Sequence, residues 1–152
     1  MEDRDEADVI ALNAANVALL APLGAPRLAW LRSLADRCDV VDVDGVVAGF
    51  VITFPPGTSY DSENYRWFGA RHDDFYYLDR IVFDSTYRRR GLATLAYDAL
   101  ETVAARHGRM CLEVNVVPPN EPSLAFHAAR GYLEVGRLGD DTYAVSLMEK
   151  PL

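Results

Sequence analysis

The sequence has 152 residues and a formal net charge of -8, and 50% of its residues are hydrophobic. This size and composition predict one globular domain spanning residues 1–152. The acidic balance excludes broad nucleic-acid binding, which requires a basic surface, but allows a small anion to be held by a few local arginines.

No segment resembles a membrane span or a targeting signal. The apolar runs are too short to cross a bilayer, and the acidic residues 1–13 are unlike a secretory or transit peptide. Cys38 and Cys111 form no CxxC pair and the histidines are scattered, so we expect no metal site and a reduced cytoplasmic compartment. Cys111 is interpreted as a small buried strand residue rather than as an acyl-carrying nucleophile.

The first third of the chain predicts two helices and then a β-hairpin. Apolar residues recur at helical spacing in residues 6–20 and 25–37. Residues 38–43 and 46–54 predict strands around Asp44-Gly45, a dipeptide that tolerates the positive φ of a hairpin turn. No clear strand precedes the first helix, so the sequence does not settle which segment forms the N-terminal edge of the sheet.

Residues 57–75 show neither the helical nor the strand period, so we expect a long loop. Loops of this length in compact domains are more often functional than accidental. The rest of the chain predicts a mixed α/β order with strand–helix–strand crossovers. Its expected elements are a strand at 76–83, a helix at 92–108, a strand at 110–117, a helix at 121–131 and strands at 132–138 and 142–150.

Three successive arginines, residues 88–90, precede Gly91 at the start of the predicted helix 92–108. A helix N-terminus carries unpaired N–H groups and a partial positive charge, so cations there require an anionic partner. Glycine lets the backbone approach a ligand closely, and arginines add bidentate bonds to phosphate. The turn therefore predicts a phosphate cradle, the alternative being a solvated run of charge. It is neither a Walker motif nor GxGxxG.

The segment RRRGLA resembles the R/Q-x-x-G-x-G/A pyrophosphate loop of the GNAT superfamily of N-acetyltransferases. The stretch IVFDSTYRRRGLA is similar to the strand–loop–helix unit of that family, and NEPSLAFHAARGY to its N-x-x-A-x-x-L-Y-x-x-x-G-F segment. Together with the element order, the similarity to the family extends over about residues 40 to 149. Within the family, the chain resembles a bacterial subgroup of predicted acetyltransferases.

This resemblance implies a GNAT-like acyl-CoA N-acyltransferase fold, a mixed central sheet flanked by helices with a splayed strand pair. It implies acetyl-CoA as co-substrate, with the pantetheine arm in the gap between the strands, the diphosphate on the arginine turn, and no metal. Asn120 would bond the pantetheine arm, or else serve only as a turn or N-cap residue. The implied cofactor-binding residues are Ile81, Val82, Phe83, Arg88, Arg89, Arg90, Gly91, Leu92, Ala93, Thr94 and Asn120.

Glu113 is the first candidate for the general base that an ammonium acceptor requires. It lies in an apolar strand sequence, where loss of solvent raises a carboxyl pKa. The strand resembles that of the catalytic glutamate in ribosomal-protein alanine acetyltransferases, although the segment from Glu113 to Asn120 is two residues longer here. Asp79, on the neighbouring strand, is a second candidate. For each carboxylate the alternative is a structural ion pair with an arginine.

His127 occupies the position where the family usually has a tyrosine that protonates the leaving thiolate. A histidine could donate as an imidazolium, which an ordinary pKa near 6.5 favours below neutrality. The alternative is a packed helix histidine that only bonds the cofactor.

The resemblance places the acceptor pocket beside the loop 57–75. Aromatic side chains there would frame the carbon skeleton of an amine, and Asp61, Glu63, Asp73 and Asp74 would attract its charge. The alternative is that the aromatics pack on the core and the acids face water. The candidate substrate-binding residues are Tyr60, Asn64, Tyr65 and Trp67.

The sequence thus predicts direct transfer of an acetyl group from acetyl-CoA to a primary amine in a ternary complex. The acceptor is a small-molecule amine or a peptide N-terminus, with no nucleic acid or membrane as partner, and exposed sheet edges are compatible with a homodimer. The competing interpretation is a non-catalytic acyl-CoA-binding module or sensor, which the arginine turn fits equally well.

Overall fold

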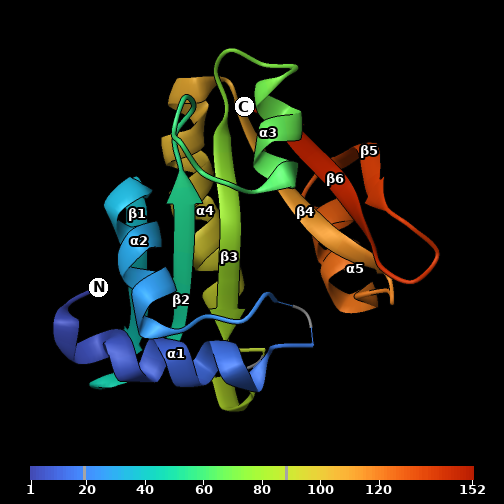
Figure 1. Ribbon diagram of the computed structural model, residues 1–152. Helices are drawn as coiled ribbons and strands as arrows, with labels where there is room; N and C mark the ends of the chain where they lie inside the picture. The colour runs from blue at the N-terminus through green and yellow to red at the C-terminus, as the bar shows by residue number, and fades with distance from the viewer. Residues whose placement is uncertain (19, 88) are drawn as a thin grey trace.

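The computed structural model of the protein describes residues 1–18, 20–87 and 89–152. Its strands are β1 Arg37–Val43, β2 Val46–Phe54, β3 Tyr76–Phe83, β4 Arg109–Val117, β5 Leu133–Gly139 and β6 Ala144–Pro151. They form one mixed sheet in the order β1-β2-β3-β4-β6-β5 (Figure 1). The pair β3–β4 is parallel and the other neighbouring pairs are antiparallel.

Helices cover both faces of this sheet. Within the described residues they are α1 Glu6–Ala15, α2 Ala25–Leu34, α3 Glu63–Gly69, α4 Leu92–Ala104 and α5 Glu121–Ala129. The first three bury side chains such as Val9, Leu28 and Phe68 in one core, while α4 buries Tyr97 and Leu100 in a second core on the opposite face. In the part of the chain that is described, no helix combines the length and the apolar character needed to span a membrane.

The elements predicted before residue 57 are confirmed, but α1 ends at Ala15 rather than at residue 20 and α2 at Leu34 rather than at residue 37. The β1–β2 hairpin turns at Asp44 and Gly45, whose φ angles of 55° and 82° are the positive values that this dipeptide tolerates. The chain starts with a short 3-10 turn, Asp3–Asp5, followed by α1, and the sheet edge is formed by β1.

The expectation of an unbroken loop at residues 57–75 is wrong, because α3 forms inside it. The Ser62 hydroxyl accepts a hydrogen bond of 3.3 Å from the backbone N–H of Tyr65 and thereby caps the helix. Tyr65 and Phe68, three residues apart, are buried on the same side. The cap residue and this spacing were the available signal, but one buried turn is too short to establish a period.

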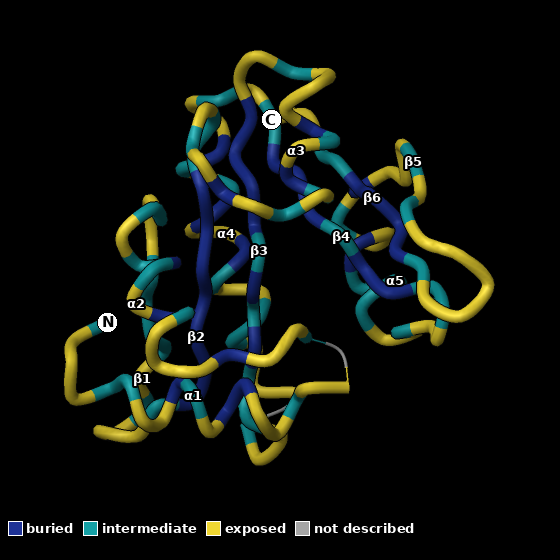
Figure 2. Tube along the Cα trace, in the orientation of Figure 1, coloured by how far each residue is buried: buried dark blue, intermediate teal, exposed yellow. Residues whose placement is uncertain are grey.

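The strands β3 and β4 pair only over their first rungs, from Tyr76↔Met110 to Leu78↔Leu112. Beyond this point β3 remains paired with β2 as far as Phe83, and β4 remains paired with β6 as far as Val117. The two strands therefore diverge inside a continuous sheet, as the predicted splayed pair requires. Figure 2 shows β2 and the first part of β3 as buried trace running through the centre of the molecule.

Candidate functional site

The opening between β3 and β4 holds a cavity of about 160 Å³, here called the gap cavity. One wall comes from the diverging strands, and the other from α4, α5 and the segment before α2. Its lining residues are Asn16, Leu20, Leu78, Asp79, Ile81, Val82, Phe83, Tyr97, Leu112, Glu113, Val114, Asn115, Asn120, Ser123 and His127.

Three predicted cofactor residues of β3, at positions 81–83, line the gap cavity as expected. Past Leu78, the backbone of β3 has no strand partner on the β4 side among the described residues. Asn120 lines the same cavity and also caps α5, since its side-chain oxygen accepts a hydrogen bond of 3.3 Å from the Ser123 N–H. The two interpretations of Asn120 are therefore compatible.

The turn between β3 and α4 is the predicted phosphate cradle. Arg89 has a φ of 61°, and Gly91 has a φ of 78° at the N-cap of α4, so the backbone reverses directly before the first helical turn. Arg89 and Arg90 are exposed, and the Arg90 guanidinium lies 5.0 Å from the centre of the Tyr87 ring. The third arginine of the prediction, Arg88, lies outside the described residues. The cradle thus presents two arginines beside the N–H groups of residues 92–94.

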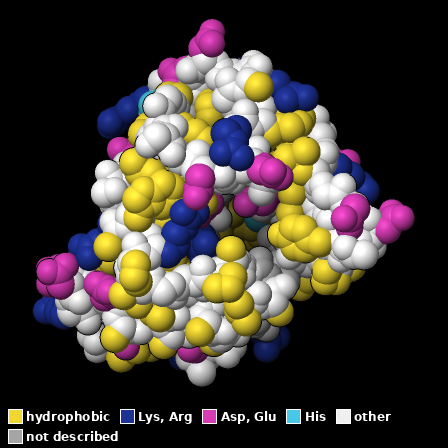
Figure 3. Space-filling model, in the orientation of Figure 1, with side chains coloured by type: hydrophobic (Ala, Val, Ile, Leu, Met, Phe, Trp, Pro, Cys, Tyr) yellow, Lys and Arg dark blue, Asp and Glu magenta, His cyan; other side chains and the backbone are white. Residues whose placement is uncertain are grey.

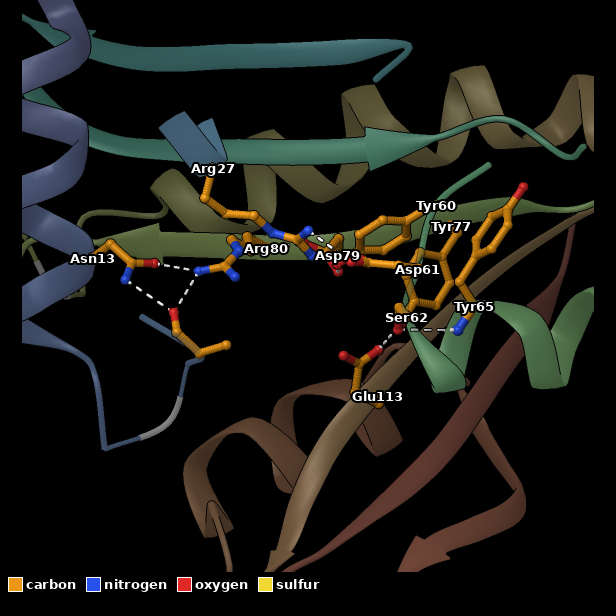
Figure 4. Close-up of polar contacts among 11 residues, drawn as sticks. Asn13, Arg27, Tyr60, Asp61, Ser62, Tyr65, Tyr77, Asp79, Arg80 and Glu113 are labelled. Atoms are coloured by element: carbon orange, nitrogen blue, oxygen red, sulfur yellow. Dashed lines mark hydrogen bonds and ion pairs between the residues drawn. The ribbon is translucent and has the colours of Figure 1, made fainter. Parts of the chain in front are cut away.

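Asp79 and Glu113 are brought together at the apex of the opening. Each directly follows the last paired rung, Leu78↔Leu112, on its own strand. The Tyr60 hydroxyl donates to Asp79 Oδ1 at 2.5 Å, and the Tyr77 hydroxyl donates a short hydrogen bond to Glu113 Oε2. The two sequence-predicted base candidates therefore lie close together, each in its own hydrogen-bonded group (Figure 4).

Burial raises the pKa of Glu113 to about 8, with the negative charge of Asp79 as the second cause and hydrogen bonds from Tyr77 and Asn64 opposing the rise. Burial also raises the pKa of Asp79, while its bonds from Tyr60 and Arg80 work in the opposite direction. Glu113 therefore releases and accepts a proton near neutral pH, which suits a general base.

His127 is buried and paired with a tyrosine that the sequence analysis did not single out. Its Nδ1 lies 2.7 Å from the Ser123 carbonyl oxygen, which can only accept, so Nδ1 carries the ring proton. Its Nε2 lies 2.5 Å from the Tyr97 hydroxyl. Burial lowers the pKa of His127 and raises that of Tyr97. Neutral His127 is thus a hydrogen-bond acceptor, and Tyr97 holds the proton between them.

A larger cavity, of about 400 Å³, opens on the other side of the two carboxylates and is here called the acceptor cavity. Figure 3 shows arginine side chains beside acidic ones around the hollow at the centre of this face. Asp79 and Glu113 line both cavities, so the carboxylate cluster joins them. The lining residues are Leu20, Ala21, Pro22, Arg27, Tyr60, Asp61, Ser62, Asn64, Asp79, Arg80, Glu113, Asn115 and Tyr143.

The structure divides the four predicted acceptor residues into two groups. Tyr60 and Asn64 line the acceptor cavity. Tyr65 is buried in the core, where its hydroxyl donates to the Pro55 carbonyl oxygen at 2.8 Å, and Trp67 packs against Gly136 of β5. Tyr65 and Trp67 are absent from the described lining, as the alternative of core-packed aromatics supposed.

The acidic side chains of residues 61–74 are spread over the surface rather than gathered at the acceptor cavity. Asp61 lines the cavity, but both of its oxygens accept hydrogen bonds from Arg27, at 2.6 and 2.8 Å. Asp74 is 2.6 Å from His107, away from the cavity. Among the described residues, no three His, Cys, Asp or Glu side chains converge as a metal site.

Residues 9–132 match the model of the acetyltransferase (GNAT) family. The chain belongs to this family. The family resemblance, the fold class and the acetyltransferase class predicted from the sequence are confirmed. No curated relative matches the chain in sequence.

Solved structures of the same fold are similar over the whole chain. Ard1 from Thermoplasma volcanium is 16% identical with a TM-score of 0.78, over 100% of this chain and 94% of that one. Naa20 from Chaetomium thermophilum, solved with a bisubstrate analogue, is 15% identical with a TM-score of 0.77, over 100% and 84%. The ribosomal-protein-alanine N-acetyltransferase of Brucella melitensis is 18% identical with a TM-score of 0.68, over 100% and 97%.

Proposed function

We propose that this protein transfers an acetyl group from acetyl-CoA directly to a primary amine, with both substrates bound at once. The observation that carries the proposal is the Asp79–Glu113 pair, which lies at the meeting point of the gap cavity and the acceptor cavity. The bisubstrate analogue named for Naa20 supports simultaneous binding in this fold. The acceptor is a small amine or a peptide N-terminus.

The described residues fit acetyl-CoA. The open edge of β3 offers backbone hydrogen-bonding groups along the gap cavity, which an extended amide-containing chain can use as a strand would. The turn at Arg89, Arg90 and Gly91 offers charge and helix N–H groups to a diphosphate. When bound, acetyl-CoA supplies a thioester carbonyl carbon that an amine can attack.

The protein contributes a base and hydrogen-bond donors. Glu113 accepts a proton at its carboxylate, directly or through a water molecule, from an acceptor that is ammonium in solution. Backbone N–H groups at residues 81–83 stabilise negative charge on the carbonyl oxygen. The Tyr97 hydroxyl lines the α4 wall of the gap cavity and donates its single proton to His127, so it can protonate the leaving sulfur only by breaking that hydrogen bond.

The experiment is release of free thiol from acetyl-CoA with a panel of primary amines. We expect turnover with at least one amine, and a fall in kcat of about 100-fold or more in Glu113→Gln. Calorimetric binding of coenzyme A should be unchanged in this variant. The control is Glu121→Gln, which changes an exposed carboxylate in the first turn of α5.

Two results would contradict the proposal. Tight coenzyme A binding without turnover for any amine would favour the non-catalytic acyl-CoA-binding module. Turnover that survives Glu113→Gln would remove Glu113 as the base and leave Asp79 or water in that role.

A further inference from the structure

Arg80 is a buried arginine in the wall of the acceptor cavity, one residue past Asp79 on β3. Its side chain is only 6% exposed. Nε donates to Asp79 Oδ2 at 3.3 Å, and Nη1 donates to Asn13 Oδ1 at 2.6 Å and to the Ala21 carbonyl oxygen at 2.7 Å. Figure 4 shows the guanidinium held between Asn13 and Asp79.

These contacts leave Nη2 with two N–H donors that no described residue accepts. Nη2 is not among the solvent-excluded side-chain atoms that lack a partner, so it is accessible to a ligand or water in the cavity that Arg80 lines. Because the guanidinium is fixed at its other nitrogens, Nη2 is already oriented before a ligand arrives. The lining of the cavity thus contains a prepared anion-binding group.

The charge balance of the acceptor cavity does not favour a purely cationic ligand. Arg27 is neutralised by Asp61 through two hydrogen bonds, and Asp79 already accepts from Tyr60 and Arg80. The remaining carboxyl group, Glu113, holds a proton through much of the neutral range, because its pKa is about 8. Each arginine of the lining is thus paired with a carboxylate, Arg27 with Asp61 and Arg80 with Asp79, so a polyamine would find little free negative charge.

We propose that the acceptor amine carries its own carboxylate, which binds Arg80 at Nη2 while the amino group lies at Glu113. Both groups line the same cavity, so one small zwitterionic molecule or segment can contact them together. The inference rests on the proposed acetyl transfer and narrows its acceptor class. The carboxylate can be the α-carboxylate of a free amino acid or the side chain of an acidic peptide residue, and the test separates these sources.

The first measurement compares matched acceptors by kcat/KM for thiol release. One pair is L-alanine and L-alaninamide, and the other is the amidated dipeptides Ala-Asp and Ala-Asn, in which the Asp side chain is the only carboxylate. We expect the carboxylate member of one pair to be preferred about 10- to 100-fold, which is the effect of a lost charge-assisted hydrogen bond. The pair that shows the preference identifies the source.

The second measurement repeats the comparison in Arg80→Lys, which keeps the positive charge but removes the second terminal nitrogen. The preference should fall to about threefold or less, because kcat/KM for the carboxylate acceptor falls more than that for the carboxylate-free one. Arg37→Lys is the matched control, because Arg37 is an exposed arginine on β1 that pairs with Asp39. Thermal melting identifies any general loss of folding.

The outcomes separate this inference from the proposed function. If amines are acetylated but both pairs are used equally, or if Arg27→Lys rather than Arg80→Lys removes the preference, the role of Arg80 is overturned and the function stands. If no amine is acetylated, calorimetry tests the binding site directly. L-alanine, L-alaninamide and the two dipeptides are then titrated into coenzyme A-saturated protein. Binding that requires the carboxylate and Arg80 supports the site, and equal or absent binding overturns it.

Discussion

The gap cavity and the acceptor cavity share two carboxylates but are built from different chemistry. Apart from the shared Asp79 and Glu113, the gap cavity is lined by backbone and by neutral side chains such as Val82, Tyr97 and neutral His127. The acceptor cavity is lined by Arg27, Asp61 and Arg80. The gap cavity can therefore hold one fixed cofactor, whereas the acceptor cavity can discriminate between acceptors by their charge.

Because of this difference, we expect the pH dependence of activity to arise at the boundary between the two cavities. Asp79 and Glu113 face both cavities; burial raises the pKa of each, and the negative charge of Asp79 raises that of Glu113 further. Cofactor binding and proton transfer should therefore respond to different substitutions and to different conditions.

The largest difference between the two cavities is expected from substitutions in the arginine turn, which should affect cofactor binding. Replacing Arg89 and Arg90 together with alanine removes two charge-assisted contacts to a diphosphate and should weaken coenzyme A binding about 100-fold. Titration calorimetry measures the change, and the loss should shrink as salt is added.

Arg4→Ala with Arg37→Ala is the matched control, since it removes the same charge from exposed arginines of other elements. Equal weakening in both double variants would mean that overall charge, and not the turn, attracts coenzyme A. Undiminished binding in the Arg89/Arg90 variant would remove the turn from cofactor binding.

A tenfold effect is expected from pH. A base with a pKa of about 8 is mainly protonated at pH 7, so kcat should rise about tenfold between pH 7 and pH 9. Asp79→Asn removes a negative charge beside Glu113 and leaves Arg80 uncompensated; both changes lower the pKa of Glu113. The activity limb should then move to lower pH.

The measurement is the pH profile of kcat under saturating substrates, with coenzyme A affinity measured at each pH. The affinity should change less than kcat across the range, because the proposed contacts to the cofactor are made by the arginine turn and by the backbone of β3 rather than by Glu113. A limb that stays in place in Asp79→Asn would show that Glu113 is not the titrating base.

A smaller effect, about three- to tenfold on kcat, is expected from Tyr97→Phe, which removes the hydroxyl on the α4 wall of the gap cavity. His127→Phe should cost less, because it leaves the Tyr97 hydroxyl in place with its proton no longer bound to a histidine. Steady-state kinetics of the two variants decide between them. A large loss in His127→Phe with no loss in Tyr97→Phe would return the donor role to the histidine that the sequence singled out.

The accuracy of the sequence-based predictions differs by element and residue for physical reasons. The Asp44-Gly45 hairpin, the strands and α4 depend on local chemistry or on long apolar periods, so they were predicted closely. Glu113 was placed correctly in a desolvating strand. The proton position at His127 was not predictable, because it depends on Tyr97, 30 residues away. The Arg27–Asp61 pair likewise joins residues 34 apart, and it neutralises a carboxylate that was expected to attract the charge of an amine.

The smallest effect is expected at Gly91, where the change tests shape without charge. Its φ of 78° is favourable for glycine, and a Cβ there would meet no atom within 4 Å. Gly91→Ala should therefore cost only the backbone strain, about 1 kcal/mol of unfolding free energy, measurable by urea denaturation. Coenzyme A affinity should fall severalfold, because the relaxed turn displaces the N–H groups that follow it.

Gly45→Ala, at a φ of 82° in the β1–β2 turn, is the control: it should cost similar stability but leave the affinity unchanged. Equal affinities in both variants would mean that the arginine side chains, rather than the shape of the turn, hold the diphosphate.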